Sequence, residues 1–218
     1  LAKLEQFYFS DNSINELPFS IGNLVSLNYI AGRNNQIAIL PESFWELNSL
    51  THLNFNYNQL SAISEGFGDL SQLRTLYLVG NQISIISENI GNLNNLEEIY
   101  LNQNLLHFIP EEIANCTNLK YLFLNQNQLD SIPQYIGNLN NLYYLDISNN
   151  QISALPYSIG ELQKINNLLA WGNNLTSLPE SICNLPENCN ISLVFNHICP
   201  PFILECIEDE ITNQICDE

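Results

Sequence analysis

The chain has 218 residues, of which 23 are Asp or Glu and only 5 are Lys or Arg, so its formal net charge is −18. Five basic residues cannot supply the positive footprint that phosphate recognition needs, which argues against nucleic acid and anionic membrane surfaces as partners. The hydrophobic fraction of 45% is ordinary for a folded protein, and polar residues interrupt every apolar stretch before the roughly 18 residues of a membrane span, so we expect no membrane insertion.

A period of 23 residues runs along the chain from its first residue. Nine such units, the last one degenerate, are assigned to residues 1–199. Leu or another apolar residue recurs at the first, fourth and seventh positions of the units, with few exceptions. The twelfth position is Asn in every unit: Asn12, Asn35, Asn58, Asn81, Asn104, Asn127, Asn150, Asn173 and Asn196.

Each unit reads in chain order as a strand, a turn and a short helical segment. Apolar and polar residues alternate over positions 6 to 10, which predicts a strand with one buried and one exposed face. The Asn that follows can bond the backbone of a neighbouring unit through both its amide and its carbonyl, and stacked units would form a ladder of such bonds. A Leu-Pro pair followed by Ile-Gly, as at residues 155–160, favours a helical or 3₁₀ turn.

Several units depart from this pattern. Ser64 and Ser87 stand where Pro is usual, so we expect the helical turns of the third and fourth units to be looser. Gly32 and Ala170 replace the large residue at position 9, which predicts a locally thinner core.

The units resemble those of the leucine-rich repeat family. The segment LKYLFLNQNQLDSIPQYIGNLNN, which begins at Leu119, matches the pattern LxxLxLxxNxLxxLPxxIGxL of the 23-residue class found in bacterial proteins. The resemblance implies an α/β fold, a right-handed solenoid with a parallel sheet on its concave face and short helical or 3₁₀ turns on its convex face. Stacked units would bury one continuous core that no single unit could form alone.

Five of the six cysteines lie near the end of the chain, and Cys116 takes an apolar core position. We expect residues 183–218 to form a cysteine-rich cap that overlaps the last repeat and covers the end of the core. Two disulfides are expected there, with the pairing open and one thiol left over. A zinc site that uses Cys199, Cys206 and His197 is the weaker alternative, because paired CxxC spacing is absent. The disulfide candidates are Cys183, Cys189, Cys199, Cys206 and Cys216.

Strand residues that point away from the core would line the concave face. Eight of the ten tyrosines fall at such positions, and all five basic residues lie on or beside them. Tyr, Trp and Arg dominate the binding energy of protein interfaces, so this face is the predicted partner-binding site. A good strand propensity of Tyr is the alternative explanation. The candidate residues are Tyr8, Tyr29, Arg33, His52, Tyr57, Arg74, Tyr77, Tyr100, Lys120, Tyr121, Phe123, Tyr143, Tyr144 and Trp171.

The sequence therefore predicts a non-catalytic module that binds a protein or peptide. A glycan-binding adhesin-type module and a structural spacer in a larger secreted protein are the alternatives, the first because amides interleave with aromatic rings on the same face. No catalytic constellation, metal site or cofactor site is expected. Disulfides predict a secreted or cell-surface location. The chain has no Met and no signal-peptide pattern, so we expect it to be a piece of a longer polypeptide.

Overall fold

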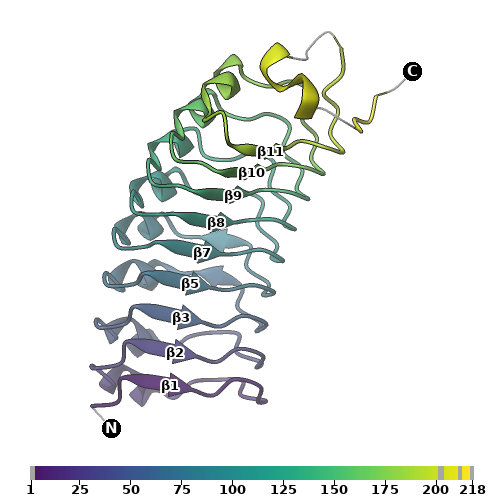
Figure 1. Ribbon diagram of the computed structural model, residues 1–218. Helices are drawn as coiled ribbons and strands as arrows, with labels where there is room; N and C mark the ends of the chain where they lie inside the picture. Colours follow the sequence, from purple (N-terminus) through teal and green to yellow (C-terminus); the bar gives the residue numbers. More distant parts are fainter. Residues whose placement is uncertain (1–2, 201–203, 211–212, 217–218) are drawn as a thin grey trace.

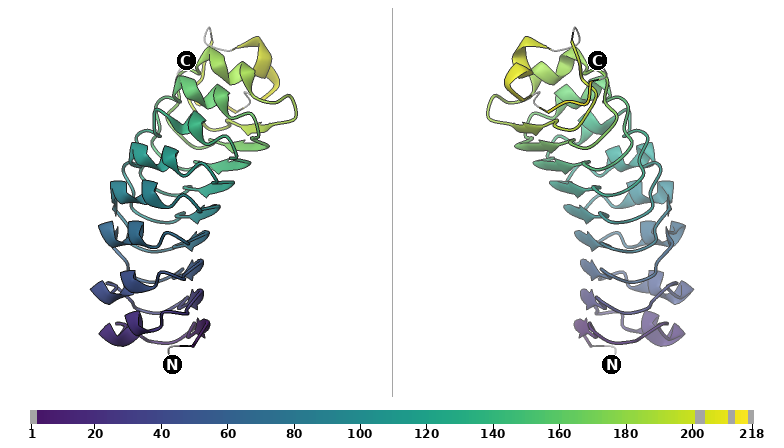
Figure 2. Two further views of the ribbon diagram at one scale, coloured as in Figure 1. Left: turned by 90° about the vertical axis from the view of Figure 1, so that its left-hand side faces the viewer. Right: turned by 90° about the vertical axis from the view of Figure 1, so that its right-hand side faces the viewer.

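A computed structural model describes residues 3–200, 204–210 and 213–216. The chain forms a curved stack of coils in which short strands line one side and 3₁₀ turns line the other (Figures 1 and 2). Each strand pairs in parallel with its equivalent one repeat later, as in Gln6 with Tyr29, so the sheet register equals the sequence period. The main sheet contains β1 (Gln6–Tyr8), β2 (Tyr29–Ala31), β3 (His52–Asn54), β5 (Thr75–Tyr77), β7 (Glu98–Tyr100), β8 (Tyr121–Phe123), β9 (Tyr144–Asp146), β10 (Asn167–Leu169) and β11 (Asn190–Ser192).

The convex side consists of 3₁₀ turns, most of which begin after a Pro in the extended conformation, such as Pro110 with φ of −63°. Pro fixes this φ and needs no hydrogen-bond partner, which suits the first position of a helical turn. The turns are η1 (Phe19–Asn23), η2 (Glu42–Glu46), η3 (Glu65–Asp69), η4 (Glu88–Asn92), η5 (Glu111–Asn115), η6 (Ile136–Asn138), η7 (Tyr157–Glu161), η8 (Glu180–Asn184) and η9 (Glu205–Glu210).

The expectation of looser turns after Ser64 and Ser87 is wrong. Turns η3 and η4 have five residues each, like most of the others, and the segments before them form a second, two-stranded parallel sheet of β4 (Ala62–Ile63) and β6 (Ile85–Ile86). The physical reason is the backbone N–H that Ser has and Pro lacks. The Ser87 N–H donates to the Ile63 carbonyl oxygen at 2.8 Å, and the Ser87 hydroxyl accepts from the Asn89 N–H at 3.2 Å.

The predicted Asn ladder is present in the interior. The Asn127 side chain accepts from the Leu106 N–H at 3.0 Å and donates to the carbonyl oxygens of Leu101 and Leu124, both at 2.9 Å. One amide therefore satisfies backbone groups of its own coil and of the preceding coil, which would otherwise be buried without partners. The same three contacts recur at Asn35, Asn58, Asn81, Asn104, Asn150, Asn173 and Asn196.

The core at Gly32 is not thinner, because neighbouring coils fill the space. A Cβ added to Gly32 would collide with the ring of Phe9 and would lie 2.9 Å from the ring of Phe55. The two rings come from the same position in the coils before and after, and their centroids are 6.1 Å apart. The small residue and its two large neighbours thus form one interlocked unit of the core.

The residue before each ladder Asn adopts a left-handed conformation in all nine coils. Gly, Asn, Asp and Gln account for seven of these positions, and Asn and Asp are among the residues that tolerate this region best. Tyr57 and Phe195 adopt it with φ of 55° and 58°, although bulky side chains are strained there. The stack of coils therefore imposes this backbone conformation, even on residues that do not favour it by themselves.

The end of the solenoid carries the cysteine cap. Disulfides join Cys183 to Cys206 and Cys199 to Cys216, while Cys189 and Cys116 are free thiols. Burial raises the pKa of Cys116 to about 12 and that of Cys189 to about 11, so both are poor nucleophiles.

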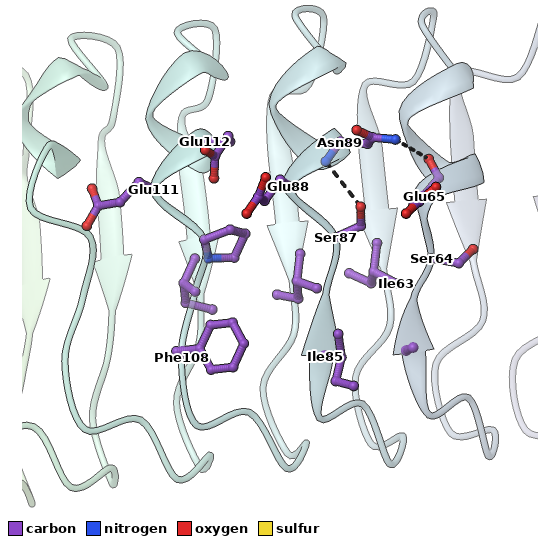
Figure 3. Close-up of a pocket in the computed structure, with 14 residues that line it drawn as sticks. Ile63, Ser64, Glu65, Ile85, Ser87, Glu88, Asn89, Phe108, Glu111 and Glu112 are labelled. Atoms are coloured by element: carbon purple, nitrogen blue, oxygen red, sulfur yellow. Dashed lines mark hydrogen bonds between the residues drawn. The ribbon is translucent and has the colours of Figure 1, made fainter.

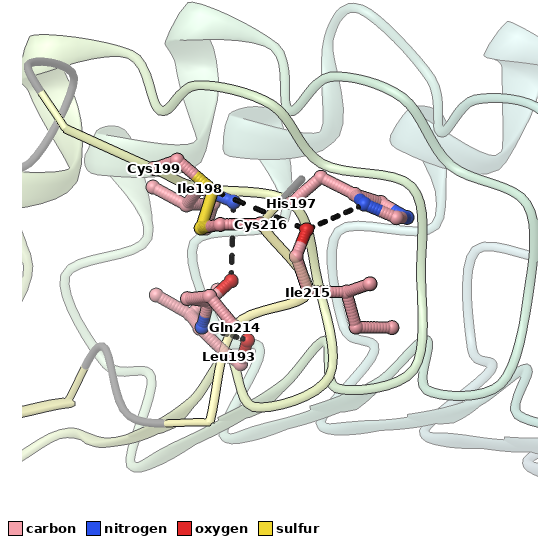
Figure 4. The surroundings of a disulfide bond; sticks show 7 residues. All are labelled: Leu193, His197, Ile198, Cys199, Gln214, Ile215 and Cys216. Carbon is pink, nitrogen blue, oxygen red and sulfur yellow. Dashed lines mark hydrogen bonds between the residues drawn. A yellow bond between two sulfur atoms is a disulfide. The ribbon is translucent and has the colours of Figure 1, made fainter. Parts of the chain in front are cut away.

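The cap also continues the Asn ladder with a Gln (Figure 4). The Gln214 side chain accepts from the Ile198 N–H at 3.1 Å and donates to the Leu193 carbonyl oxygen at 3.0 Å. In the other coils, the equivalent backbone N–H and carbonyl groups bond to the Asn side chain of the next coil. Asn213, directly before Gln214, has the same left-handed conformation, with φ of 52°, as the residues before the ladder Asn. The cap thus reproduces one turn of a tenth coil without its strand.

Candidate functional site

The concave surface of the main sheet carries two separate groups of aromatic rings. The first lies on β1, β2 and β3, where the Tyr8 and Tyr29 rings are 5.0 Å apart and the Tyr29 and His52 rings stack at 5.6 Å. Tyr8 is exposed, whereas Tyr29 and His52 are half-buried. Asn54 and Thr75 stand between this group and the next one along the sheet.

The second group, which we call the aromatic strip, runs over β5, β7, β8 and β9. Its rings follow one another with centroid separations of 4.8 Å from Tyr77 to Tyr100, 4.4 Å from Tyr100 to Phe123 and 4.9 Å from Phe123 to Tyr144. The strand spacing of about 4.8 Å imposes these distances once aromatic residues occupy neighbouring strands. Because all four side chains are half-buried, the strip presents a continuous apolar surface with polar edges.

One carboxylate fixes the Tyr77 hydroxyl at the edge of the strip. The Tyr77 hydroxyl donates to the Glu98 carboxylate at 2.6 Å. Burial, and then this hydrogen bond to a negative group, raise the pKa of the Tyr77 phenol well above its usual range. Burial and the nearby Glu98 charge also raise the pKa of Tyr100. Both phenols therefore stay neutral hydrogen-bonding groups over the physiological range.

Basic residues beside the strip are held by one acid. The Glu97 carboxylate binds the Arg74 guanidinium at 2.9 Å and the Lys120 ammonium at 2.6 Å. The hydrogen bond from Lys120 and the two positive charges lower the pKa of Glu97. Arg74 and Lys120 keep half or more of their side-chain surface exposed, at 57% and 50%, so they remain accessible to a partner.

The remaining candidate residues lie around these groups. The Arg33 guanidinium lies 5.2 Å from the centre of the Tyr57 ring, a cation–π distance. Tyr121 and Tyr143 meet edge to face at 6.2 Å and, with Lys120 and Lys164, line a shallow pocket of about 280 Å³. Trp171 is half-buried on the C-terminal part of the same face.

Two polar features of this face are not evident from the repeat pattern. Asp146 lies at a strand position next to the strip, where burial raises the pKa of its carboxyl although Ser148 donates to it at 2.6 Å. The Thr75 hydroxyl is buried without a hydrogen-bond partner among the described residues. Their burial could not be predicted from the sequence, because both residues occupy columns that the repeat pattern assigns to the exposed face.

The carboxylates and thiols of the described residues that could carry chemistry are engaged in structural contacts. Glu97 and Glu98 are adjacent but engaged in different contacts, with basic residues and with a phenol respectively, and so do not act as a paired acid and base. Cys199 and Cys206 belong to different disulfides, which rules out the zinc alternative that would use their thiolates. Within the described residues no group of His, Cys, Asp and Glu side chains is placed to hold a metal ion.

A family model described as "Leucine-rich repeat region" matches residues 1–105 and 104–194. The chain belongs to the leucine-rich repeat family. The resemblance in the sequence and the expected parallel-sheet solenoid are thereby confirmed. No curated protein sequence matches this leucine-rich repeat chain significantly.

Solved leucine-rich repeat structures are similar over most of the chain. A leucine-rich repeat protein of Leptospira interrogans is 29% identical with a TM-score of 0.70, and the match covers 88% of this chain and 56% of that one. The plant peptide hormone receptor RGFR1, solved in complex with RGF2, is 29% identical with a TM-score of 0.74 and coverages of 89% and 36%. A chain of the Toll–Spatzle complex of Drosophila is 26% identical, with a TM-score of 0.73 and coverages of 86% and 27%. This leucine-rich repeat chain therefore spans between 27% and 56% of their length.

Proposed function

We propose that this leucine-rich repeat chain is a non-catalytic recognition module that binds a protein or peptide across its concave face. The observation that carries the proposal is the aromatic strip of Tyr77, Tyr100, Phe123 and Tyr144, with ring separations between 4.4 and 4.9 Å. Core packing does not require these rings, because they project from the sheet surface opposite the core. Rigid aromatic surface with hydroxyl groups is typical of interface hot spots.

The conformation of Tyr57 adds support. Its left-handed backbone disfavours a bulky side chain by about 1–2 kcal/mol, and Gly80 and Gly172 hold the same position in other coils. Tyr57 nevertheless exposes 41% of its surface and lies under Arg33. A strained, exposed aromatic residue beside a cation is better explained by contact with a partner than by stability.

The solved neighbours agree with this class of function. RGFR1 is solved with RGF2, and Toll is solved with Spatzle, so similar solenoids occur in complexes with ligands. The two disulfides of the cap favour an oxidising compartment, and we therefore place the protein outside the cytosol, secreted or at the cell surface. None of the described helices has the length and hydropathy to cross a bilayer.

The test is selection from a displayed random-peptide library and, in parallel, binding to a glycan array. Peptides selected on the wild-type chain should lose affinity when Tyr100 and Phe123 are replaced by Ala, by about 30-fold for each hot-spot ring. The matched controls are Tyr135→Ala and Tyr157→Ala, which remove rings that are 60% and 63% exposed on the convex side. These control variants should bind the same peptides as the wild-type chain does.

Three outcomes would contradict the proposal. Selected peptides that bind the Tyr100→Ala and Phe123→Ala variants unchanged would move the binding site off the strip. Glycan binding that depends on the same rings, without peptide binding, would favour the adhesin-type alternative, since sugar C–H faces also stack on aromatic rings. Absence of any ligand in both screens would leave the structural spacer as the better description.

A further inference from the structure

The convex side carries two rows of side chains that occur together in only part of the stack. Position 16 of the repeat places an apolar residue at the surface in coils 2, 3, 4 and 5, and position 19 places an acid there in the same four coils. The exposed fractions of Ile39, Ile85 and Phe108 are 76%, 56% and 53%, which is high for such apolar side chains. The apolar row is Ile39, Ala62, Ile85 and Phe108, and the acidic row is Glu42, Glu65, Glu88 and Glu111.

The other coils show that the fold does not require either row. The apolar position holds Glu16, Ser131 and Ser177 in coils 1, 6 and 8, and the acidic position holds Phe19, Gln134 and Tyr157 in coils 1, 6 and 7, so none of coils 1, 6, 7 and 8 carries both features. These coils form the same concave strand and a 3₁₀ turn at the same place as coils 2 to 5, and they lack equivalents of β4 and β6, which contain Ala62 and Ile85. The coincidence of the two rows over four consecutive coils therefore needs an explanation other than packing.

A groove runs between the rows. Its main part has a volume of about 920 Å³ and is lined by residues of coils 3, 4 and 5, with Ile85 and Phe108 on its apolar side and Glu65, Glu88 and Glu112 along the 3₁₀ turns (Figure 3). A smaller part of about 250 Å³ adjoins it through Ala62 and Ser64 and extends to Ile39 and Trp45. The groove thus follows the solenoid axis and crosses the coils.

The charge of the groove is negative and uncompensated. None of its lining residues is basic. The salt bridges of the described residues both involve Glu97 on the opposite face. Glu111 accepts from the N–H groups of Gln134 and Tyr135 at 2.8 and 3.2 Å and forms no ion pair within the described residues. A partner that buries this surface must bring positive charge, because buried unpaired carboxylates are strongly disfavoured.

The spacing of the acidic row selects the shape of the partner. Strand pairing joins coils 2 to 5 in the main sheet, and joins coils 3 and 4 a second time through β4 and β6, so successive coils lie about 4.8 Å apart at these strands. An α-helix repeats a side-chain position about every 5.4 Å, whereas an extended strand repeats one about every 6.7 Å. Over three coil intervals a helix drifts from the row by about 2 Å, which flexible Lys and Arg side chains absorb, and a strand drifts by nearly 6 Å.

We propose that this convex groove binds an amphipathic α-helix of a partner protein, with an apolar stripe on Ile39, Ile85 and Phe108 and an adjoining Lys/Arg stripe on the acidic row. The helix lies along the solenoid axis. Addition of a strand to the small sheet is excluded by geometry, because the edges of β4 and β6 face the neighbouring coils. The site shares no residue with the concave aromatic strip, so the two faces can be tested separately.

The experiment measures binding of a synthetic peptide about four helical turns long, with Leu on one stripe and Arg on the next, to the full 218-residue chain. The expected result is saturable binding that weakens as salt is added. Ile85→Ser with Phe108→Ser should weaken it by about tenfold or more, and Glu65→Gln with Glu88→Gln should weaken it and flatten the salt dependence. Ser and Gln occupy these positions in other coils, so the variants preserve the fold.

Matched probes make the result decisive. A peptide of the same composition with the stripes scrambled should bind at least about tenfold more weakly, and the concave variant Tyr100→Ala should bind the striped peptide as the wild type does. Equal binding of striped and scrambled peptides would reduce the groove to a nonspecific acidic surface. Absence of binding, insensitivity to the Ser substitutions, or preference for a Pro-containing extended peptide would overturn the proposal.

Discussion

Replacement of Asn127 by Ala tests the Asn ladder at the middle of the stack. The substitution removes one acceptor and two donor contacts while the neighbouring coils keep their own Asn residues. The buried N–H of Leu106 loses its partner outright. The carbonyl oxygens of Leu101 and Leu124 each keep one amide donor, from Asn104 and Asn150 respectively.

The expected loss of stability follows from these three contacts. An orphaned buried N–H costs about 1–3 kcal/mol, and each lost carbonyl contact costs about 0.5–1.5 kcal/mol. Together they give a loss of about 4 kcal/mol in the free energy of unfolding, which is large for the replacement of one polar side chain. The matched control is Asn12→Ala. Asn12 is exposed and donates only to carbonyl oxygens of its own coil, those of Phe9 and Ser10, so its removal should cost about 1 kcal/mol or less.

Urea unfolding followed by intrinsic fluorescence measures both variants against the wild-type chain. Repeat proteins are stabilised chiefly by contacts between neighbouring coils, so a central break should also broaden the transition as the two halves uncouple. The reasoning is refuted if Asn127→Ala and Asn12→Ala lower the unfolding midpoint equally. A large loss of stability for both variants would mean that the Asn stabilises the turn of its own coil rather than the contact between coils.

Three further predictions concern single groups. Burial and the hydrogen bond to Glu98 raise the pKa of Tyr77 in the folded chain. The contribution of this phenol to stability should therefore be fully present below about pH 10, the pKa of an unfolded Tyr, and should be lost as the pH rises further. Glu98→Gln should lower the pKa of the phenol, measured by tyrosinate absorbance. Replacing both Cys183 and Cys206 by Ser should lower the free energy of unfolding of the C-terminal coils by about 3 kcal/mol, measured by denaturation or hydrogen exchange, because the bridge closes a loop with a sequence separation of 23 residues. Tyr57→Gly should leave stability unchanged or raise it by up to about 1 kcal/mol in urea unfolding, and a clear loss would show that the left-handed Tyr is not strained.

The repeat period accounts for most of what could be predicted of the fold. The Asn column fixes the register, and the register places each strand beside its equivalent one repeat away, so the sheet and the ladder follow directly from the sequence. The left-handed turn could not be predicted from Tyr57 and Phe195, because the stack imposes it against their own preference. The second sheet was missed because one of its hydrogen bonds comes from the Ser87 N–H, a group that the usual Pro at this position would lack.

The candidate sites differ in how far the sequence revealed them. The columns of the repeat placed the aromatic rings on one face, but their division into two groups depends on ring contacts that a pattern does not contain. The two columns that flank the convex groove are present in the sequence, but the repeat pattern does not show that they enclose a groove. Gln214 could not be recognised as an equivalent of the ladder Asn, because it lies 18 residues after Asn196 (214 − 196) and so falls outside the period of 23.

The Gln214 turn also bears on how copies of the chain meet one another. A terminal parallel strand such as β11 is a template on which a further strand, from any chain, can add and begin edge-to-edge aggregation. Here the Phe195 N–H already donates to the Asn213 carbonyl oxygen at 3.0 Å, and the Ile198 N–H donates to Gln214. Phe195 and Ile198 follow β11, so the donors that would receive the turn of a tenth coil are already occupied. A coil from another chain could therefore extend the stack at this end only by displacing the cap from these two donors.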